Sequence, residues 1–385
     1  MINKICIVTG SRAEYDLLYW IISNVNDDPV LELQLLVTGT HLSPGFGYTV
    51  SEIENDGFAI SKKVEMILSA DTSSGITKST GLGMIGFADA FAELNPDIII
   101  LLGDRYEILA AAFSAVVARI PIAHIHGGET TTGAFDEAIR HSITKMSYLH
   151  FVAAEEYKKR VIQLGEEPDR VFLVGGLGVD GVIKADLLSK KELEDDLGFL
   201  IASKTLLITF HPVTLDNRGP RDQLNELLAA LETMDDTKFI FTAPNSDTGN
   251  SVIYNGINEF VSKNPDNSIL FDSMGRKRYL SCLQFVDAVV GNSSSGLLEC
   301  PTFNIGTINI GDRQDGRLKA DSVIDCEPIQ ESILKAFKRL YSTDFQKNLK
   351  NVKNPYGNGG ASNKVVEILK KEQLPKEIKK QFYNL

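Results

Sequence analysis

Short apolar runs alternate with longer amphipathic segments along almost the whole chain. The apolar runs are rich in β-branched residues and are typical of strands buried in a parallel sheet, whereas the segments between them have helical periodicity. Helices are predicted, for example, over Glu14–Asn24 and Arg105–Arg119. Because strands and helices alternate, the predicted fold class is α/β, with parallel sheets covered by helices on both sides. The predicted strands are Lys4–Thr9, Glu32–Val37, Ile98–Leu102, Ile120–His126, His150–Ala153, Val171–Val174, Leu206–Phe210, Lys238–Thr242, Ser268–Phe271, Ala288–Val290 and Gly306–Ile310.

The length of 385 residues predicts two domains, because single hydrophobic cores stop growing at about 250–300 residues. The rhythm of strands and helices occurs twice, which predicts Rossmann-like domains over residues 1–183 and 184–365. The boundary is placed after GGLGVDG and before the charged segment KKELEDDLG. Residues 366–385 are charged and rich in Lys, and they are predicted to form a helix that packs back onto the first domain.

The chain is acidic, with a formal net charge of −12. A chain of this charge is not expected to bind nucleic acid or an anionic membrane, so a phosphorylated ligand must be held by a few placed cations and backbone amides. The N-terminal MINKICIVTG is predicted to be a strand and not a signal peptide. No run approaches the roughly 20 apolar residues that span a bilayer, and the four Cys residues have no metal-type spacing. These features predict a reduced, cytoplasmic, soluble protein.

The predicted strand that ends at Val290 leads directly into the motif GNSSSG, and an acid follows at Glu299. A strand that turns through small hydroxyl residues into a helix points backbone N–H groups and the positive end of the helix dipole at one spot. Such a spot suits a phosphate, and Glu299 can reach a ribose diol from about one turn into the helix. The motif therefore predicts a site for a nucleotide diphosphate, formed by Ser293, Ser294, Ser295, Gly296 and Glu299.

Two charged motifs follow predicted strands of the first half, TGSRAEY and GDRYE. Ligands collect at the carboxyl edge of an open parallel sheet, where Arg12 could fork onto a diphosphate. Asp104 and Arg105 lie at the same edge, and Asp104 could handle a proton or accept from a sugar hydroxyl. The alternatives are that Arg12 is a solvated residue at a helix start and that Asp104 caps a helix.

The stretch HIHGGETTTGAFDEAIRHSITK contains the highest density of polar residues in the chain. His124 and His126 alternate along a strand end, so only one of them can point into a cleft unless the strand bends. Histidine exchanges protons near neutral pH, and carboxylates and a cation follow it here. A metal site is not predicted, because the stretch has no HExxH and no other metal-type spacing. The polar candidates that follow the histidines are Glu129, Asp136, Glu137, Arg140 and His141.

Three motifs of the second half also follow predicted strands. TFHPVT places His211 at a strand exit, where it would look into an interdomain cleft, although a hydrogen-bonded loop histidine is an equal alternative. APNSDTG contributes Asn245 and Asp247. GDRQDGR contributes Arg313, the counterpart of Arg12 in the first half. Arginines at strand ends of both halves of an acidic chain indicate one small anion held between them.

Taken together, these motifs resemble the UDP-N-acetylglucosamine 2-epimerase family. The match covers nearly the whole chain in order, through TGSRAEY, VTGTHLS, GDR, HIHGGE, DEAIRHSITK, TFHPVT, PNSDTG, GNSSSGLLE and INIGDRQDGR. GDRYE, IRHSITK and GNSSSG are similar to the hydrolysing branch, which makes N-acetylmannosamine for sialic acid synthesis. The EAGLRTGD-type stretch of the non-hydrolysing bacterial branch is absent from this chain.

The resemblance implies two Rossmann-like domains that face each other across a cleft, as in GT-B glycosyltransferases, with a UDP-sugar in the cleft. It implies a UDP site made of Arg12, Asn245, Ser293, Ser294, Glu299 and Arg313. Around the sugar it implies the catalytic groups Asp104, His126, Asp136, Glu137 and His211. Further substrate-binding candidates are His41, Arg105, Glu129, Arg140, Asp247, Ser295 and Gly296. Many relatives have IEGG where this chain has IHGG, so the role of that carboxylate is expected to lie with His126 or Glu129.

The implied reaction starts with the departure of UDP, whose charge Arg12, Arg313 and the serine-rich turn would neutralise. A carboxylate or histidine takes the proton from C2 and leaves a glycal, and water then adds to give free N-acetylmannosamine. The expected partners are the UDP-sugar, UDP and a second copy of the chain in a homodimer, with no metal and no cofactor.

Other functions are compatible with the same motifs. A hydrolysing 2-epimerase of UDP-2,4-diacetamido-2,4,6-trideoxyglucose, for legionaminic acid synthesis, differs only in the substrate groups at C4 and C6. A UDP-dependent glycosyltransferase would not need acid–base groups at C2, and the cluster of Asp136, Glu137 and His141 disfavours it. A non-catalytic sensor of nucleotide sugars is disfavoured by the many titratable groups.

Overall fold

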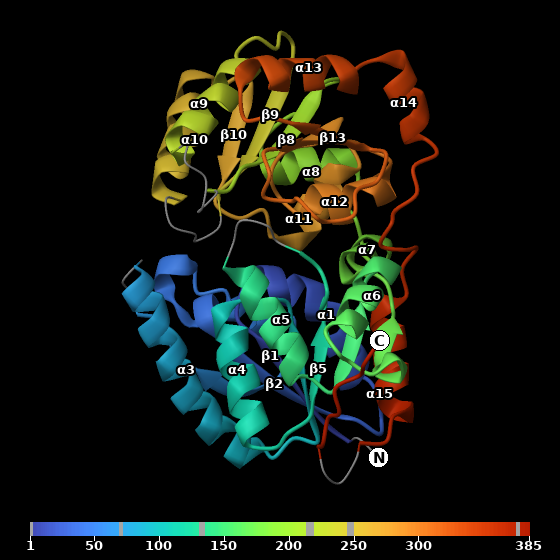
Figure 1. Ribbon diagram of the computed structural model, residues 1–385. Helices are drawn as coiled ribbons and strands as arrows, with labels where there is room; N and C mark the ends of the chain where they lie inside the picture. The colour runs from blue at the N-terminus through green and yellow to red at the C-terminus, as the bar shows by residue number, and fades with distance from the viewer. Residues whose placement is uncertain (1–2, 69–71, 131–134, 213–218, 245–249, 375–377) are drawn as a thin grey trace. The chain divides into compact units, whose positions relative to one another are not determined.

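A computed structural model of the chain describes residues 3–68, 72–130, 135–212, 219–244, 250–374 and 378–385 (Figure 1). The chain forms two compact units. The first comprises residues 1–129, 135–181 and 359–385, and the second comprises residues 130–134 and 182–358.

The first unit is built on a seven-stranded parallel sheet with the order β3-β2-β1-β4-β5-β6-β7. Alternate residues of its strands enter different cores: Ile5 and Ile7 pack on one face, and Cys6 and Val8 pack on the other. Apolar burial on both faces requires helices on both faces, as predicted. The strands are β1 (Lys4–Thr9), β2 (Glu32–Thr38), β3 (Ile60–Val64), β4 (Ile98–Leu102), β5 (Ile122–Ile125), β6 (Leu149–Val152) and β7 (Val171–Leu173).

Most helices of the first unit follow a loop at the end of a strand. Helix α1 illustrates why: Ser11 caps its first turn, and Leu18, Ile21, Ile22 and Val25 form the face that is buried against the sheet. The helices are α1 (Arg12–Asn26), α2 (Val50–Asn55), α3 (Ser73–Leu94), α4 (Tyr106–Val117), α5 (Asp136–Met146), α6 (Glu155–Gln163), α7 (Leu177–Ile183), which crosses into the second unit, and α15 (Ala361–Lys371).

The second unit has a six-stranded parallel sheet with the order β10-β9-β8-β11-β12-β13. Leu206 and Ile208 pack on one face, and Leu207 packs on the other, so this sheet is also covered on both sides. The strands are β8 (Thr205–Thr209), β9 (Lys238–Thr242), β10 (Ser268–Phe271), β11 (Ala288–Gly291), β12 (Gly306–Ile310) and β13 (Val323–Cys326). The helices are α8 (Lys190–Leu197), α9 (Pro220–Leu231), α10 (Asn250–Lys263), α11 (Gly275–Leu283), α12 (Ser295–Leu298), α13 (Gln330–Leu340) and α14 (Thr343–Leu349). The prediction of two α/β domains with parallel sheets is confirmed.

The C-terminal tail differs from the predicted helix over residues 366–385. Helix α15 ends at Lys371 and packs against α1, and none of the described residues after it is helical. The helix ends because Glu372 has extended backbone, with φ of −69° and ψ of +138°. The tail is nevertheless anchored: Tyr383 donates its backbone N–H to Gly165, and the Lys380 ammonium donates to the carbonyls of Lys145 and Ser147.

Among the helices that the structure describes, none combines the length and the apolar character needed to cross a bilayer.

Candidate functional site

The loop after β1 carries Arg12 and is held tightly against its neighbour. Gly39 approaches so closely that a Cβ there would lie 2.4 Å from the carbonyl oxygen of Gly10, and its φ of +61° is in the left-handed region. Thr40 donates to the same carbonyl through its N–H and its hydroxyl, at 2.8 and 3.1 Å. Arg12 is the first residue of α1. The ends of β1 and β2 therefore form one packed edge of the sheet.

His41 supports this edge from within. Its ring lies between two hydroxyls, with Nε2 3.0 Å from Thr9 Oγ1 and Nδ1 2.8 Å from Thr49 Oγ1. Burial, together with the nearby charge of Arg12, lowers the pKa of His41 to about 4, so the ring is neutral at physiological pH. The structure thus places this predicted substrate contact in the interior, with both ring nitrogens facing protein hydroxyls.

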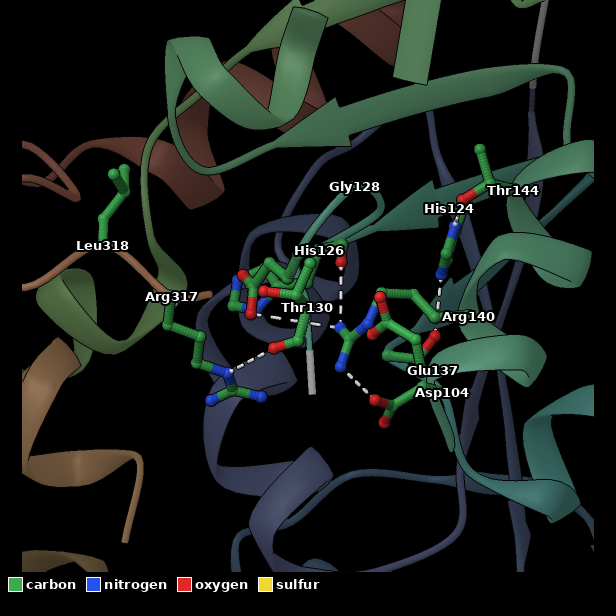
Figure 2. Close-up of polar contacts among 12 residues, drawn as sticks. Asp104, His124, His126, Gly128, Thr130, Glu137, Arg140, Thr144, Arg317 and Leu318 are labelled. Carbon is green, nitrogen blue, oxygen red and sulfur yellow. Dashed lines mark hydrogen bonds and ion pairs between the residues drawn. The ribbon is translucent and has the colours of Figure 1, made fainter. Parts of the chain in front are cut away.

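Asp104, His126 and Arg140 lie close together near the ends of β4 and β5, as Figure 2 shows, and Glu129 lies beside His126 and Arg140. Arg140 of α5 is buried, and its guanidinium donates to Asp104 Oδ2 and, at 3.1 Å, to the His126 carbonyl oxygen. Its Nη1 lies 3.9 Å from Glu129 Oε2, and Glu129 Oε1 lies 3.2 Å from His126 Nδ1. Burial opposes the charge of Arg140, but Asp104 and Glu129, with Glu137 and Asp136, outweigh it and raise its pKa. Arg140 is therefore a permanent cation between two carboxylates.

The two histidines of the HIHGG motif have different surroundings. His124 is fully buried, with Nε2 2.8 Å from the Gly103 carbonyl oxygen and Nδ1 3.2 Å from Thr144 Oγ1. Burial lowers its pKa to about 3, so it stays neutral. His126 has a φ of +63°, which bends the chain away from strand geometry at the point where it joins the Asp104 cluster. Only His126 lies with the charged residues, which agrees with their alternation along the strand.

The first turn of α5 carries Asp136 and Glu137. Glu137 Oε1 lies 3.1 Å from His141 Nε2, one turn further along the helix. Figure 2 shows Glu137 beside Arg140 and Asp104. The first unit therefore brings together Asp104, His126, Glu129, Glu137 and Arg140, all of which the sequence singled out.

Two residues of this region were missed by sequence reasoning. Glu107 accepts from Arg105 Nε at 2.7 Å, and Glu14 accepts from the Gly10 N–H at 2.7 Å. Both side chains are buried. Each lies in the first turn of a helix, where a glutamate ordinarily signals only a favourable interaction with the helix dipole.

In the second unit, Asn292 joins the ends of β8 and β11. Its side chain accepts from the His211 N–H at 2.7 Å and donates to the His211 carbonyl at 2.8 Å, and it is fully buried. Gly291 before it must be glycine, because a Cβ there would lie 1.9 Å from the Thr209 carbonyl oxygen. Burial, with a contribution from Arg313, lowers the pKa of His211 well below its usual range. The His211 ring is therefore neutral, and Asn292 holds this residue through its backbone N–H and carbonyl.

The backbone carbonyl of Asn292 collects donors from the loop after β12. Arg313 Nη1 donates to it at 3.1 Å, and Gln314 Nε2 donates to it at 2.8 Å. The structure thus brings Arg313 and His211 together around Asn292, a residue within the GNSSSG motif that sequence reasoning left without a role. Gln314 was also missed, although it follows the Arg313 that was selected.

The serine-rich turn differs from the predicted helix start. Helix α12 has only four residues and is followed directly by a 3₁₀ turn over Cys300–Phe303, so it has little macrodipole. Any phosphate contact there would rest on individual N–H groups and hydroxyls of Ser293, Ser294 and Ser295. Tyr279 supports the turn by donating to Ser295 Oγ at 2.6 Å.

Two other residues of this turn have distinct environments. Gly296 lies against Thr307, where a Cβ would come within 2.4 Å of the threonine Cγ2. Burial raises the pKa of Glu299, against the hydrogen bond from Ser295 and the charge of Arg276. Its Oε2 finds no hydrogen-bond partner among the described residues, which suits an acceptor for a ribose diol.

Two predicted contacts, Asn245 and Asp247, lie outside the residues that the structure describes. Within the described part of the chain, no group of three or more His, Cys, Asp or Glu side chains is arranged to hold a metal ion.

Comparison with known proteins gives consistent matches. The family model for UDP-N-acetylglucosamine 2-epimerase matches residues 23–370. The chain is 43% identical over 384 residues to the GDP/UDP-N,N'-diacetylbacillosamine 2-epimerase (hydrolyzing) of Campylobacter jejuni, covering 100% of this chain and 99% of that protein. It is 39% identical to the polysialic acid biosynthesis protein P7 of Escherichia coli, over 96% of this chain and 94% of that protein.

A solved structure shares the fold. The UDP-GlcNAc 2-epimerase from Neisseria meningitidis, bound to UDP-GlcNAc, aligns with a TM-score of 0.82 at 20% identity, over 96% of this chain and 100% of that chain. With the family model covering most of the sequence, the chain belongs to the UDP-N-acetylglucosamine 2-epimerase family.

Proposed function

We propose that this protein is a hydrolysing 2-epimerase that acts on a UDP-linked 2-acetamido sugar. The observation that carries the proposal is the cluster of the partly buried Asp104 with the buried His126, Glu129 and Arg140, which offers proton-exchanging groups at the carboxyl edge of the first sheet. The full-length relative from Campylobacter jejuni, described as hydrolyzing, supports the same reaction class.

The chemistry of these side chains supports proton transfer at C2 of the sugar. Glu129 Oε1 lies 3.2 Å from His126 Nδ1, within ion-pair range, so this carboxylate can stabilise a proton that the imidazole takes up. Arg140 is in direct contact with the Asp104 carboxylate and fixes its position. One of these two groups takes the C2 proton as the bond between C1 and UDP breaks. When water adds at C1 of the glycal, the other group takes the proton that the water loses and passes it to C2.

The second unit supplies the leaving-group site in this proposal. Arg313 and the amides and hydroxyls of Ser293, Ser294 and Ser295 bind the diphosphate, and Arg12 of the first unit contributes a second cation. Glu299 binds the ribose. Neutralising the diphosphate makes UDP a better leaving group, which is needed because a sugar C2 proton is only weakly acidic.

Two substrates are candidates. N,N'-diacetylbacillosamine is a 2,4-diacetamido-2,4,6-trideoxy sugar, and the relative at 43% identity favours its UDP form. UDP-N-acetylglucosamine, for sialic acid synthesis, is favoured by the relative at 39% identity, which is described as a polysialic acid biosynthesis protein.

The experiment is to incubate the protein with each UDP-sugar in heavy water. We expect release of UDP and of the free 2-epimeric sugar, deuterated at C2, and the faster of the two reactions identifies the substrate. Release of UDP without C2 deuterium would contradict the elimination mechanism, and no UDP from either sugar would refute the activity.

We also propose that the protein forms a homodimer through the exposed faces of α3 and α4, which pack against each other. Leu82, Ile85, Phe113, Val116 and Val117 are between 43% and 68% exposed there. A standard interface buries about 800 Å² per partner, to which these apolar side chains would contribute. A patch without charge pairs well with its own copy, even in a chain of net charge −12.

Light scattering tests the proposed homodimer. The wild type should be a dimer, and the double variant Ile85→Glu, Val117→Glu should be a monomer. A monomeric wild type would refute the proposal.

A further inference from the structure

Two buried glutamates lie beneath the site and have no part in the proton transfers proposed above. Glu14 and Glu107 are 5% and 0% exposed. Buried carboxyl groups are costly unless they are paired or hold a proton. Their positions in the fold show which of these applies.

Both glutamates border Gly10, from different loops. Glu14 Oε2 accepts from the Gly10 N–H at 2.7 Å. Glu107 covers the Cα of Gly10 so closely that an added Cβ would lie 2.5 Å from its Cγ and 3.0 Å from its Oε1. The two carboxyl groups are therefore neighbours across one glycine.

Each carboxyl group has one oxygen that is engaged and one that is not. Glu107 Oε1 accepts from Arg105 Nε at 2.7 Å, and Glu14 Oε2 accepts from Gly10. Among the described residues, Glu14 Oε1 and Glu107 Oε2 find no hydrogen-bond partner. A proton on one of these oxygens would turn two unsatisfied acceptors into a donor and an acceptor.

A simpler interpretation is that Glu14 only caps α1. It occupies the third position of the helix, and Ser11 accepts from its N–H, as in a capping box. However, in a capping box the glutamate accepts from the backbone N–H of the N-cap residue itself. Here it accepts from Gly10, one residue earlier, and it is buried against a second carboxyl group.

The charges that face Glu14 agree with a retained proton. Burial raises its pKa to about 8, and Glu107 and Asp104 also raise it, against Arg105 and the Gly10 hydrogen bond. One guanidinium cannot neutralise two carboxylates, and Arg105 is in direct contact with Glu107.

We propose that Glu14 and Glu107 form a carboxylic acid–carboxylate pair, with the proton on Glu14, and that this pair positions the loops that carry Arg12 and Asp104. Arg12 precedes Glu14 by two residues, and Asp104 precedes Glu107 by three residues, so the pair ties the two loops together through Gly10. The inference concerns positioning, and it rests on the proposed function because Arg12 and Asp104 are assigned there to the diphosphate and to the C2 proton.

The pair predicts a loss of activity at alkaline pH. When Glu14 loses its proton, two carboxylates repel each other beside Gly10 and the loops separate. Glu14→Gln imitates the protonated form, since its amide can donate to Glu107 while its oxygen accepts from Gly10. At pH values above the Glu14 pKa of about 8, the kcat/KM of the wild type should fall and that of Glu14→Gln should not. We expect the ratio of the variant's kcat/KM to the wild type's to rise by about tenfold per pH unit.

The matched control is Glu156→Gln, which changes an exposed glutamate in the first turn of α6 and should keep the wild-type pH profile. A Glu14→Gln profile that coincides with that of the wild type would overturn the inference. If the wild type releases no UDP from either sugar, the proposed function fails instead, and the pair is judged by stability alone.

Stability gives that separate readout. The pKa of Glu14 is raised in the folded state, from an ordinary value of about 4.5 to about 8. The protein therefore loses folding stability as the pH rises between these two values. The melting temperature of Glu14→Gln relative to the wild type should therefore rise across this interval and level off above it. A difference independent of pH would refute the shared proton. If Glu14→Gln does not fold, infrared difference spectra of the wild type across the same interval should show the carboxylic acid band disappearing, and its absence at neutral pH would be equally decisive.

Discussion

The strand-end loops of the two units are built from different kinds of groups. In the first unit, Asp104, Arg140, Glu129 and His126 form a chain of charged and titratable groups. In the second unit, the centre is a neutral amide, Asn292, which holds backbone and side-chain groups in place. A chain of titratable groups can move protons, whereas a fixed set of dipoles and one cation can bind an anion without exchanging protons. Equivalent edges of two similar sheets can therefore divide acid–base chemistry from anion binding.

The largest expected effect is on the proton-handling side. Asp104→Asn keeps the shape of the side chain but removes the charge that faces Arg140. We expect turnover to fall by about 10²–10⁴-fold while UDP affinity stays near that of the wild type. Steady-state kinetics and UDP calorimetry measure the two quantities. Asp89→Asn, at an exposed position of α3, is the control, and an Asp104→Asn turnover close to that of this control would contradict the division of roles.

The next effect should appear in the second unit as lost stability. Asn292→Ala removes two buried hydrogen bonds and leaves the N–H and carbonyl of His211 without their partner. Since each unsatisfied buried group costs about 1–3 kcal/mol, we expect a loss of about 2–4 kcal/mol in the free energy of unfolding of this unit. Urea unfolding measures it, with the exposed Asn225→Ala as control. A loss below about 1 kcal/mol would show that the amide is not the organising group.

A smaller effect distinguishes binding from chemistry. Arg313→Ala removes the cation next to Asn292 and should weaken UDP binding by roughly 10–100-fold, in line with a charged hydrogen bond. The turnover number at saturating sugar should change much less than in Asp104→Asn. Arg221→Ala, which changes an exposed residue of the same unit, should bind UDP normally. Unchanged UDP affinity in Arg313→Ala would remove the anion-binding role.

The smallest expected effect on activity is at Glu166, which belongs to a charge network of the first unit outside the site. A change there tests whether this network serves stability alone. Glu166 lies 2.9 Å from His150 Nε2 and 2.6 Å from Lys145 Nζ, and it also pairs with Lys380 of the tail. Burial alone would raise its pKa, but these partners outweigh it and lower the pKa to about 2.

Because this pKa is depressed, the stabilising contribution of Glu166 is present above about pH 4.5 and is lost as pH falls toward 2. Glu166→Gln should lower the melting temperature at neutral pH by the equivalent of about 1–3 kcal/mol and leave kcat/KM within a few-fold of the wild type. The difference from the wild type should shrink on acidification. A large loss of turnover would show that this network also serves the site.

The buried elements and the edge elements differ in how well the sequence predicted them. Central strands such as β1, β4 and β8 are continuous apolar runs, so burial on both faces could be recognised directly. Among the edge strands of the two described sheets, β7 and β10 were predicted, whereas β3 and β13 were missed because ISKKV and VIDC are short and partly polar. An edge strand exposes one side and does not need the apolar pattern that marks a central strand.

The sequence alone determined which polar residues stand at strand ends, because strand and loop are local properties, and it determined the family through its ordered motifs. Only the tertiary structure decided which of those residues meet. Arg140 reaches Asp104 across 36 positions, and Asn292 reaches His211 across 81. The tertiary structure also placed Glu14 and Glu107 on either side of Gly10, which the sequence did not predict. The physical reason is that burial and charge pairing depend on neighbours in space, and a parallel sheet makes neighbours of loops that lie far apart along the chain.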